Sequence, residues 1–260
     1  GLQFHHGGRR VQIRFADDGS LLPLWEDNLS VSDTLVLTTE TRHATDEQAE
    51  YVLREVGRAI APFASPDSDG NPPIILFKKI DSTLRGNWAA EVAALQTMAG
   101  LAIVAPAFPA TGRTTLDGRV WVNGQPLEST DTWQLEHAGR CADIDGLLAE
   151  AGLRTAPLKL EVLRGDVEAL AEHIHAAARS GVQALIVDAQ TVQDLRILAQ
   201  VTLKLDQPLY WVGSGGLARE IAQLAGLPDA LSDGLPAAAQ APILALVGNE
   251  MVRNRRHDQN

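Results

Sequence analysis

The residues that could do chemistry in this sequence are concentrated at positions 78–87. Three cationic and three oxygen-bearing side chains lie within this stretch: Lys78, Lys79, Arg85, Asp81, Ser82 and Thr83. Ammonium and guanidinium groups bind carboxylates and phosphates, and the oxygen-bearing groups can hydrogen-bond to sugar hydroxyls. Helix capping would explain one of the oxygen-bearing side chains, but it would not explain three cations. The stretch therefore predicts a site for a small, anionic, hydroxylated ligand.

Two regular elements must position this stretch. Residues 74–77 form an apolar run typical of a buried strand, and residues 88–95 carry apolar side chains at helical spacing. In open α/β sheets, ligands bind beyond the carboxyl ends of the strands, where helix N-termini also offer unpaired N–H groups to anions. Because side chains alternate along a strand, we expect only one of Lys78 and Lys79 to reach the pocket.

The same strand-then-helix pattern recurs along the chain. Apolar or alternating runs predict further strands at residues 11–15, 34–39, 101–105, 158–163, 184–188, 209–212 and 242–248, with helices between most of them. This alternation predicts an α/β fold, a mainly parallel sheet with helices on both faces. Asn123-Gly124 predicts a small inserted β-hairpin, and residues 128–142 show little periodicity and are expected to form a loop.

Other strand ends also carry polar or glycine residues that could share the edge of the site. Arg113 has the guanidinium fork that suits carboxylates and phosphates, and Arg42 is the least supported of the cations. Gly213-Ser214-Gly215-Gly216 resembles a cradle for a phosphate or carboxylate, with a tight strand-to-helix connection as the alternative. Asp81 could bind hydroxyls or act as a base, and helix capping is its equal alternative.

The composition argues against several classes of protein. A formal net charge of -11 argues against a general nucleic-acid surface, and no apolar run approaches the roughly 18 residues of a membrane span. Cys141 is the single cysteine, so a disulfide within the chain is impossible and we infer a reducing, cytoplasmic setting. No metal-ligand spacing emerges, so no metal site is expected. The sequence has neither the dinucleotide-binding glycine fingerprint nor a Walker-type loop.

Three segments together resemble the signatures of the four-carbon acid sugar kinase family. They are Lys78–Asn87, Pro106–Thr114 with Gly118 and the hairpin after it, and Val212–Ala218. The resemblance implies ATP-dependent phosphorylation of a four-carbon sugar acid such as threonate, erythronate or an oxo-tetronate, with Mg²⁺ bridging the phosphates. The alternative from another class is a sugar-acid-binding module with no catalysis of its own.

The resemblance also implies roles for individual residues. Arg85, with Arg113, would hold the carboxylate or the transferring phosphate, and Asp81 and Asn87 would bind hydroxyls. The expected substrate-binding residues are Lys79, Asp81, Ser82, Thr83, Arg85, Asn87, Phe108, Arg113, Gly213, Ser214 and Gly215. The catalytic base stays unassigned, with Asp81 as a candidate, because the family's Asp-Asp-containing turn would lie before Gly1.

Members of the resembled family have a substrate-binding domain followed by a nucleotide-binding domain. By this resemblance, residues 1–240 are expected to form a sugar-acid-binding α/β domain without its first strand. Residues 241–260 are expected to begin a truncated nucleotide-binding domain, so this chain alone is expected to be inactive as a kinase. The expected partners are a small sugar acid and further copies of the chain in a homo-oligomer, with no nucleic acid and no membrane.

Overall fold

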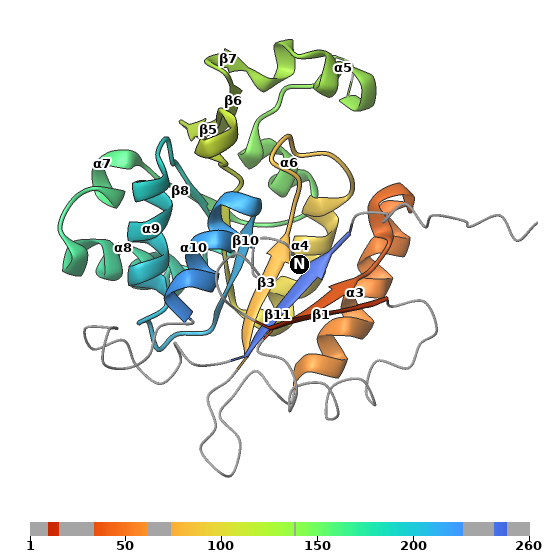
Figure 1. Cartoon of the computed structure of the whole chain (residues 1–260), viewed down its shortest axis with the longest axis horizontal. Helices are drawn as coiled ribbons and strands as arrows, with labels where there is room; N and C mark the ends of the chain where they lie inside the picture. Colours follow the sequence, from red (N-terminus) through yellow and green to blue (C-terminus); the bar gives the residue numbers. More distant parts are fainter. Residues whose placement is uncertain (1–9, 16–33, 62–73, 138, 226–241, 249–260) are drawn as a thin grey trace, which may run out of the picture.

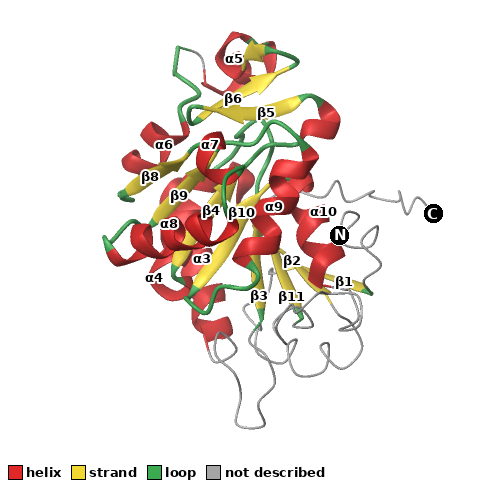
Figure 2. Cartoon of the chain, turned by 90° about the vertical axis from the view of Figure 1, so that its left-hand side faces the viewer, coloured by secondary structure: helices red, strands yellow, loops and turns green. Residues whose placement is uncertain are grey.

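The fold is a layered α/β arrangement in a computed structural model that describes residues 10–15, 34–61, 74–137, 139–225 and 242–248. Its main sheet consists of β1 (Val11–Phe15), β2 (Thr34–Thr38), β3 (Ile75–Lys79), β4 (Leu101–Ala105), β8 (Thr155–Leu158), β9 (Ala184–Val187), β10 (Leu209–Gly213) and β11 (Ile243–Val247). The strand order is β1-β2-β11-β3-β10-β4-β9-β8, and neighbouring strands are parallel. Figure 1 shows the sheet between its helices, and Figure 2 labels each of its strands. The predicted α/β class is confirmed.

Helices cover both faces of the sheet, as the sequence predicts. The helices α3 (Asp46–Ile60), α4 (Trp88–Ala99) and α6 (Ile144–Glu150) pack on one face; α7 (Leu160–Leu163), α8 (Val167–Arg179), α9 (Val192–Thr202) and α10 (Gly215–Ala225) pack on the other. Successive side chains of a strand point to opposite faces of the sheet, so each strand contributes to a hydrophobic core on either face. In β4, Ala102 and Val104 pack in the core under α3, α4 and α6, while Ile103 packs in the core under α7 to α10. Within the described residues, no helix has the length and apolarity to cross a membrane.

An antiparallel element is inserted after β4 and stands beyond the carboxyl edge of the main sheet (Figure 2). It contains β5 (Arg113–Leu116), β6 (Arg119–Val122) and β7 (Gln125–Pro126). The turns Asp117-Gly118 and Asn123-Gly124 have positive φ at both positions, which suits the right-handed twist of two-residue hairpins. The predicted hairpin at Asn123-Gly124 is confirmed, and β5 adds a third strand to it.

Two local predictions are wrong. Residues 128–142, expected to form a loop, include η4 (Leu127–Ser129) and the helix α5 (Asp131–His137). Burial of Trp133, whose side chain is fully inaccessible, stabilises α5 despite the weak periodicity of its sequence. The strand expected at residues 158–163 ends at Leu158, and α7 follows it. Leu160 and Leu163 are three residues apart, so a helical turn buries both of them on one side.

The strand β11 lies inside the main sheet, between β2 and β3. It belongs to residues 241–260, which the sequence predicts to begin a second domain; residues 249–260 lie outside the described part of the chain. Its apolar residues 243–246 are buried and contribute to both cores. In this structure, β11 is therefore part of the sheet that the preceding residues form. The assignment of residues 241–260 to a nucleotide-binding domain stays a prediction.

A buried ion pair fixes the end of β3 against α4. Lys78 Nζ lies 2.6 Å from Glu91 Oε2, and these side chains are 0% and 4% exposed. The other Glu91 oxygen accepts a hydrogen bond from Thr41 Oγ1, which lies in the short 3₁₀ helix η1 (Thr41–His43) after β2. Lys78 therefore points into the interior and away from any ligand. Glu91 joins β3, α4 and η1 at the carboxyl edge of the sheet.

We expect Lys78→Met to lower the free energy of unfolding by about 3–5 kcal/mol, because it leaves Glu91 as a buried charge with no cation beside it. Adding Glu91→Gln should recover part of this loss, since no uncompensated charge then remains. Urea unfolding would measure both variants.

The control is Lys159→Met, which removes a cation 3.9 Å from Asp117 in an exposed ion pair. Exposed pairs contribute about 0–1 kcal/mol, so this variant should unfold close to the wild type. Equal losses for Lys78→Met and Lys159→Met would contradict the importance of the buried pair.

Candidate anion-binding site

The turn that follows β3 places several polar side chains at the carboxyl edge of the sheet. Leu84 and Gly86 both have positive φ, which reverses the chain before α4 begins at Trp88. A Cβ on Gly86 would lie 3.2 Å from Arg42 Cγ, so the turn passes close to η1. The buried side chain of Leu84 holds the turn against the core. The turn therefore places the cations of residues 78–87 beside Arg42, which lies in η1 after β2.

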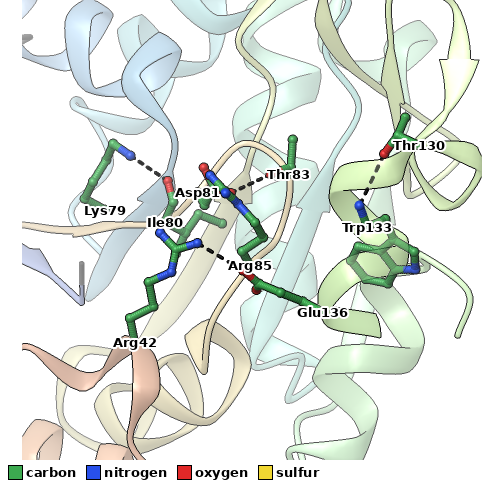
Figure 3. Close-up of polar contacts among 9 residues, drawn as sticks. All are labelled: Arg42, Lys79, Ile80, Asp81, Thr83, Arg85, Thr130, Trp133 and Glu136. Carbon is green, nitrogen blue, oxygen red and sulfur yellow. Dashed lines mark hydrogen bonds and ion pairs between the residues drawn. The ribbon is translucent and has the colours of Figure 1, made fainter. Parts of the chain in front are cut away.

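Asp81 and Arg85 are paired within this turn (Figure 3). Arg85 Nε donates to Asp81 Oδ2 at 2.5 Å, and Thr83 Oγ1 donates to the same oxygen. Burial alone would raise the pKa of Asp81, but the hydrogen bonds from Arg85 and Thr83 and the nearby positive charges outweigh burial and lower it. The pKa of Arg85 is raised, chiefly by its hydrogen bond to Asp81. Asp81 is therefore a stable carboxylate.

Lys79 is the second cation of the turn. Its Nζ donates to the carbonyl oxygen of Ile80 at 2.7 Å. Burial lowers the pKa of Lys79 to about 8, and the charge of Lys78 adds to this, while the charge of Asp81 opposes it. Lys79 is thus mostly protonated at pH 7 and becomes neutral at moderately alkaline pH. Of the two lysines, Lys79 is the one that reaches the site, in agreement with strand alternation.

These side chains line a small hollow. It is bounded by Arg42, Lys79, Ile80, Asp81, Arg85, Gly86, Asn87, Trp88, Glu91 and Gly248. Among the residues that line the hollow, Lys78-paired Glu91 and Arg85-paired Asp81 are the acids, so Arg42 and Lys79 are lining cations that neither of these two acids pairs with. Guanidinium and ammonium groups in a recess at a strand end suit a carboxylate or a phosphate.

Asn87 connects this hollow to η1 rather than pointing free into it. Its Nδ2 donates to the carbonyl oxygens of Thr41, at 2.9 Å, and Ala44, at 2.5 Å. Both amide hydrogens of Asn87 are thereby used within the protein. Its direct role in binding hydroxyls stays a prediction, whereas its contacts show that it positions the segment that carries Arg42.

The other predicted residues lie outside this hollow, although on the same edge of the sheet. Gly213 pairs with Lys79 of β3 and with Ala105 of β4 in the strand register. Ser214 is 1% exposed, donates to Ala107 O and accepts from Gly216 N. For residues 213–216, these contacts favour the interpretation as a tight strand-to-helix connection rather than as an anion cradle.

Two more predicted residues belong to the segment that enters the inserted element. Arg113 pairs through its backbone with Phe108, and its side chain donates to Thr111 O at 2.8 Å. The predicted substrate-binding residues that line the hollow are Lys79, Asp81, Arg85 and Asn87, and Thr83 orients Asp81. Ser82, Phe108, Arg113, Gly213, Ser214 and Gly215 do not line it. Their roles in ligand binding stay predictions.

The structure also adds residues that sequence patterns do not single out. The sequence places Glu91 in the predicted helix after the turn, and no sequence pattern indicates its buried ion pair with Lys78. Arg42 Nη2 lies 3.1 Å from Glu136 Oε1, and Glu136 comes from α5 of the inserted element (Figure 3). Arg42 at a strand end was a weak signal, and Glu136 offered none because α5 itself was not predicted.

The described residues offer no evident metal site. No group of three or more His, Cys, Asp or Glu side chains among them is arranged to hold an ion. Asp81, the carboxylate nearest to the cations, is neutralised by Arg85. The residues in this part of the chain therefore do not fit a resident Mg²⁺ ion, and we assign none of them to it.

The hollow at the strand ends of this α/β fold thus carries the positive charge that a small anionic ligand would require. Residues 2–221 match the family described as the sugar-binding N-terminal domain, and the chain belongs to that family.

Two curated relatives carry kinase names. A D-threonate kinase of Cupriavidus necator is 55% identical over 174 residues, which cover 67% of this chain and 42% of the relative. A D-erythronate kinase of Heliobacterium modesticaldum is 34% identical over 174 residues, covering 64% of this chain and 37% of the relative. This chain thus spans less than half the length of these relatives.

A solved structure from Bordetella bronchiseptica has the same fold. It is 26% identical, with a TM-score of 0.67, and the match covers 96% of this chain and 69% of that one. That protein is described as a domain-swapped dimer with bound citrate.

We expect the Lys79 ammonium group to titrate near pH 8 in the ligand-free protein, because burial disfavours its charged form. NMR of labelled lysine side chains would follow the titration, and Lys79→Met would identify the signal by removing it. Asp81→Asn should lower the pKa of Lys79 further, since the charge of Asp81 favours the protonated amine. A Lys79 signal that titrates at the ordinary value of 10.5 would contradict the burial of this amine.

Proposed function

We propose that this chain is the substrate-binding domain of an ATP-dependent kinase that phosphorylates four-carbon sugar acids, with D-threonate as the first candidate. The observation that carries the proposal is the hollow that collects Arg42, Lys79 and Arg85 at the carboxyl edge of the sheet. It occurs in a chain of the sugar-binding family that is 55% identical to a D-threonate kinase over the aligned region. A sugar acid presents one carboxylate and several hydroxyls, which match cations beside hydrogen-bonding groups.

Within this proposal, Arg85 and Arg42 bind the carboxylate of the sugar acid, and Lys79 adds a nearby positive charge. Asp81 accepts hydrogen bonds from substrate hydroxyls with the oxygen capacity that Arg85 and Thr83 leave. Asp81 is a poor candidate for the catalytic base, because its lowered pKa makes its carboxylate a weak proton acceptor. The base therefore stays unassigned. Citrate bound to the Bordetella protein supports a carboxylate ligand for this fold.

ATP is the proposed phosphoryl donor, and Mg²⁺ the ion that accompanies it. Both belong to the whole protein, of which this chain matches the substrate-binding part. The substrate domain would bind and orient the acid so that a terminal hydroxyl faces the donor. On its own, the chain should bind the acid without turning it over.

Two further properties belong to the same proposal. We place the protein in the cytoplasm, a setting that the single cysteine among the 260 residues of this chain supports. We also propose a homo-oligomer, which the domain-swapped dimer of the Bordetella protein supports. Mass measurement of the full-length protein in solution would test the oligomer.

We expect the full-length protein to phosphorylate D-threonate, D-erythronate or 3-oxo-tetronate in a coupled kinase assay with ATP and Mg²⁺. No turnover with any of the three acids would overturn the proposed reaction. Binding of an acid by calorimetry without any turnover would instead favour a non-catalytic sugar-acid-binding module.

We expect Arg85→Ala to weaken binding of the acid that proves to be the substrate by about 2–5 kcal/mol, because it removes a cation that pairs with the carboxylate. Calorimetry would measure the change. Arg54→Ala is the matched control: Arg54 is 59% exposed, pairs with Glu50 on α3 and does not line the hollow. If both variants kept the affinity of the wild type, Arg85 would not be a residue that binds the acid.

A further inference from the structure

Glu136 places a carboxylate of the protein itself beside the cations of the hollow. Its Oε1 lies 3.1 Å from Arg42 Nη2, with the two side chains 36% and 20% exposed. Its charge also contributes to the raised pKa of Arg85, after the larger contribution of the Asp81 hydrogen bond. Figure 3 shows Arg42, Arg85 and Glu136 converging from three different elements. The Glu136 carboxylate thus pairs with a hydrogen-bond donor of Arg42 that an anionic ligand would also use.

The position of Glu136 in α5 is unfavourable unless a cation lies nearby. Glu136 is the second-last residue of α5, near the helix end where the macrodipole disfavours negative charge. The helix is held in place by Trp133, which is fully buried and donates from Nε1 to Arg140 O at 2.7 Å. Because α5 is anchored in this way, its backbone holds Glu136 beside Arg42. Only its side chain needs to rotate to leave Arg42.

Arg42 in turn has capacity that the protein does not use. Among the described residues, its buried Nε has no hydrogen-bond partner, and its Nη2 is directed to Glu136. The Asn87 amide and the Glu91 carboxylate hold the segment of Arg42 through Thr41. A guanidinium that is fixed at its base and incompletely paired is suited to a carboxylate that accepts two hydrogen bonds at once.

We propose that Glu136 is the internal counter-ion of Arg42 when no ligand is bound, and that an anionic ligand binds Arg42 by taking the place of the Glu136 carboxylate. The proposal rests on the proposed function for the identity of the ligand, a four-carbon sugar acid. The competition lowers the affinity for every anion that uses Arg42, and hydrogen bonds to the hydroxyls of a sugar acid offset part of this loss.

The test is calorimetry on the full-length protein with D-threonate, D-erythronate and citrate as probes. Glu136→Gln keeps the shape of the side chain but removes the competing charge. An exposed ion pair is weak, so we expect this variant to bind the anions about two- to fivefold more tightly than the wild type. The control is Glu128→Gln, which neutralises an acid of the same inserted element that pairs with Arg119 at 2.7 Å.

The comparison separates this inference from the proposed function. Unchanged or weaker binding by Glu136→Gln would overturn the role of Glu136, even if the wild type phosphorylates a sugar acid. An equal gain in Glu128→Gln would also overturn it, because the effect would then follow the net charge. If the wild type bound citrate but neither sugar acid, the proposed function would fail, and a tighter complex of Glu136→Gln with citrate would still support the counter-ion.

A measurement without any ligand tests the ion pair itself. Arg42→Gln, Glu136→Gln and the double variant form a double-mutant cycle in thermal unfolding. Since the pair is partly exposed, the double variant should lose about 1–2 °C less in Tm than the sum of the two single losses. Strictly additive losses would show that the two side chains do not interact, and would overturn the proposal whatever the probes bind.

Discussion

The carboxylate of Glu91 is the constraint on which the carboxyl edge of the sheet depends. It is buried, and it meets Lys78 from β3 and Thr41 from η1. A buried charge that loses its partner costs several kcal/mol, so these three elements cannot shift independently. Gly248, after β11, also lies against it: a Cβ there would be 2.6 Å from Glu91 Oε1. The ends of β2, β3 and β11 and the start of α4 are thus fixed around one side chain that no ligand needs to touch.

In the ligand-free protein, the arginines around the hollow are paired with acidic side chains of the protein itself. Asp81 pairs with Arg85 and Glu136 pairs with Arg42, while burial lowers the pKa of Lys79 to about 8 and so makes its proton easier to lose. Affinity for an anion is therefore a difference between the contacts that the ligand makes and those that the protein gives up. This explains how a hollow with three cations can stay folded without a bound anion. It also makes the surrounding acids as relevant to affinity as the cations.

The sequence predicts those parts of the fold that depend on neighbouring residues. Strand periodicity and the Asn123-Gly124 turn are local, and the structure contains that turn and most of the strands predicted from periodicity. The cationic turn at residues 78–87 could also be predicted, because its residues are contiguous in the sequence. The interaction of Arg42 with Glu136 joins residues that are 94 positions apart, and no local pattern reports it. The insertion of β11 between β2 and β3 is equally non-local, because pairing order depends on the whole sheet.

The glycine-rich turn after β10 shows how packing can produce a pattern that resembles a binding motif. A Cβ on Gly216 would lie 2.7 Å from Ala107 O and 3.1 Å from Phe108 Cα, so glycine is required for the close approach of α10 to the segment after β4. The Ser214 hydroxyl is used within the same contact. The ligand-binding role of this turn stays a prediction, and the proposed function places recognition on the charged side chains of the hollow. Such binding is sensitive to salt and to substitutions that change charge but keep shape, because screening acts most strongly on partly exposed ions.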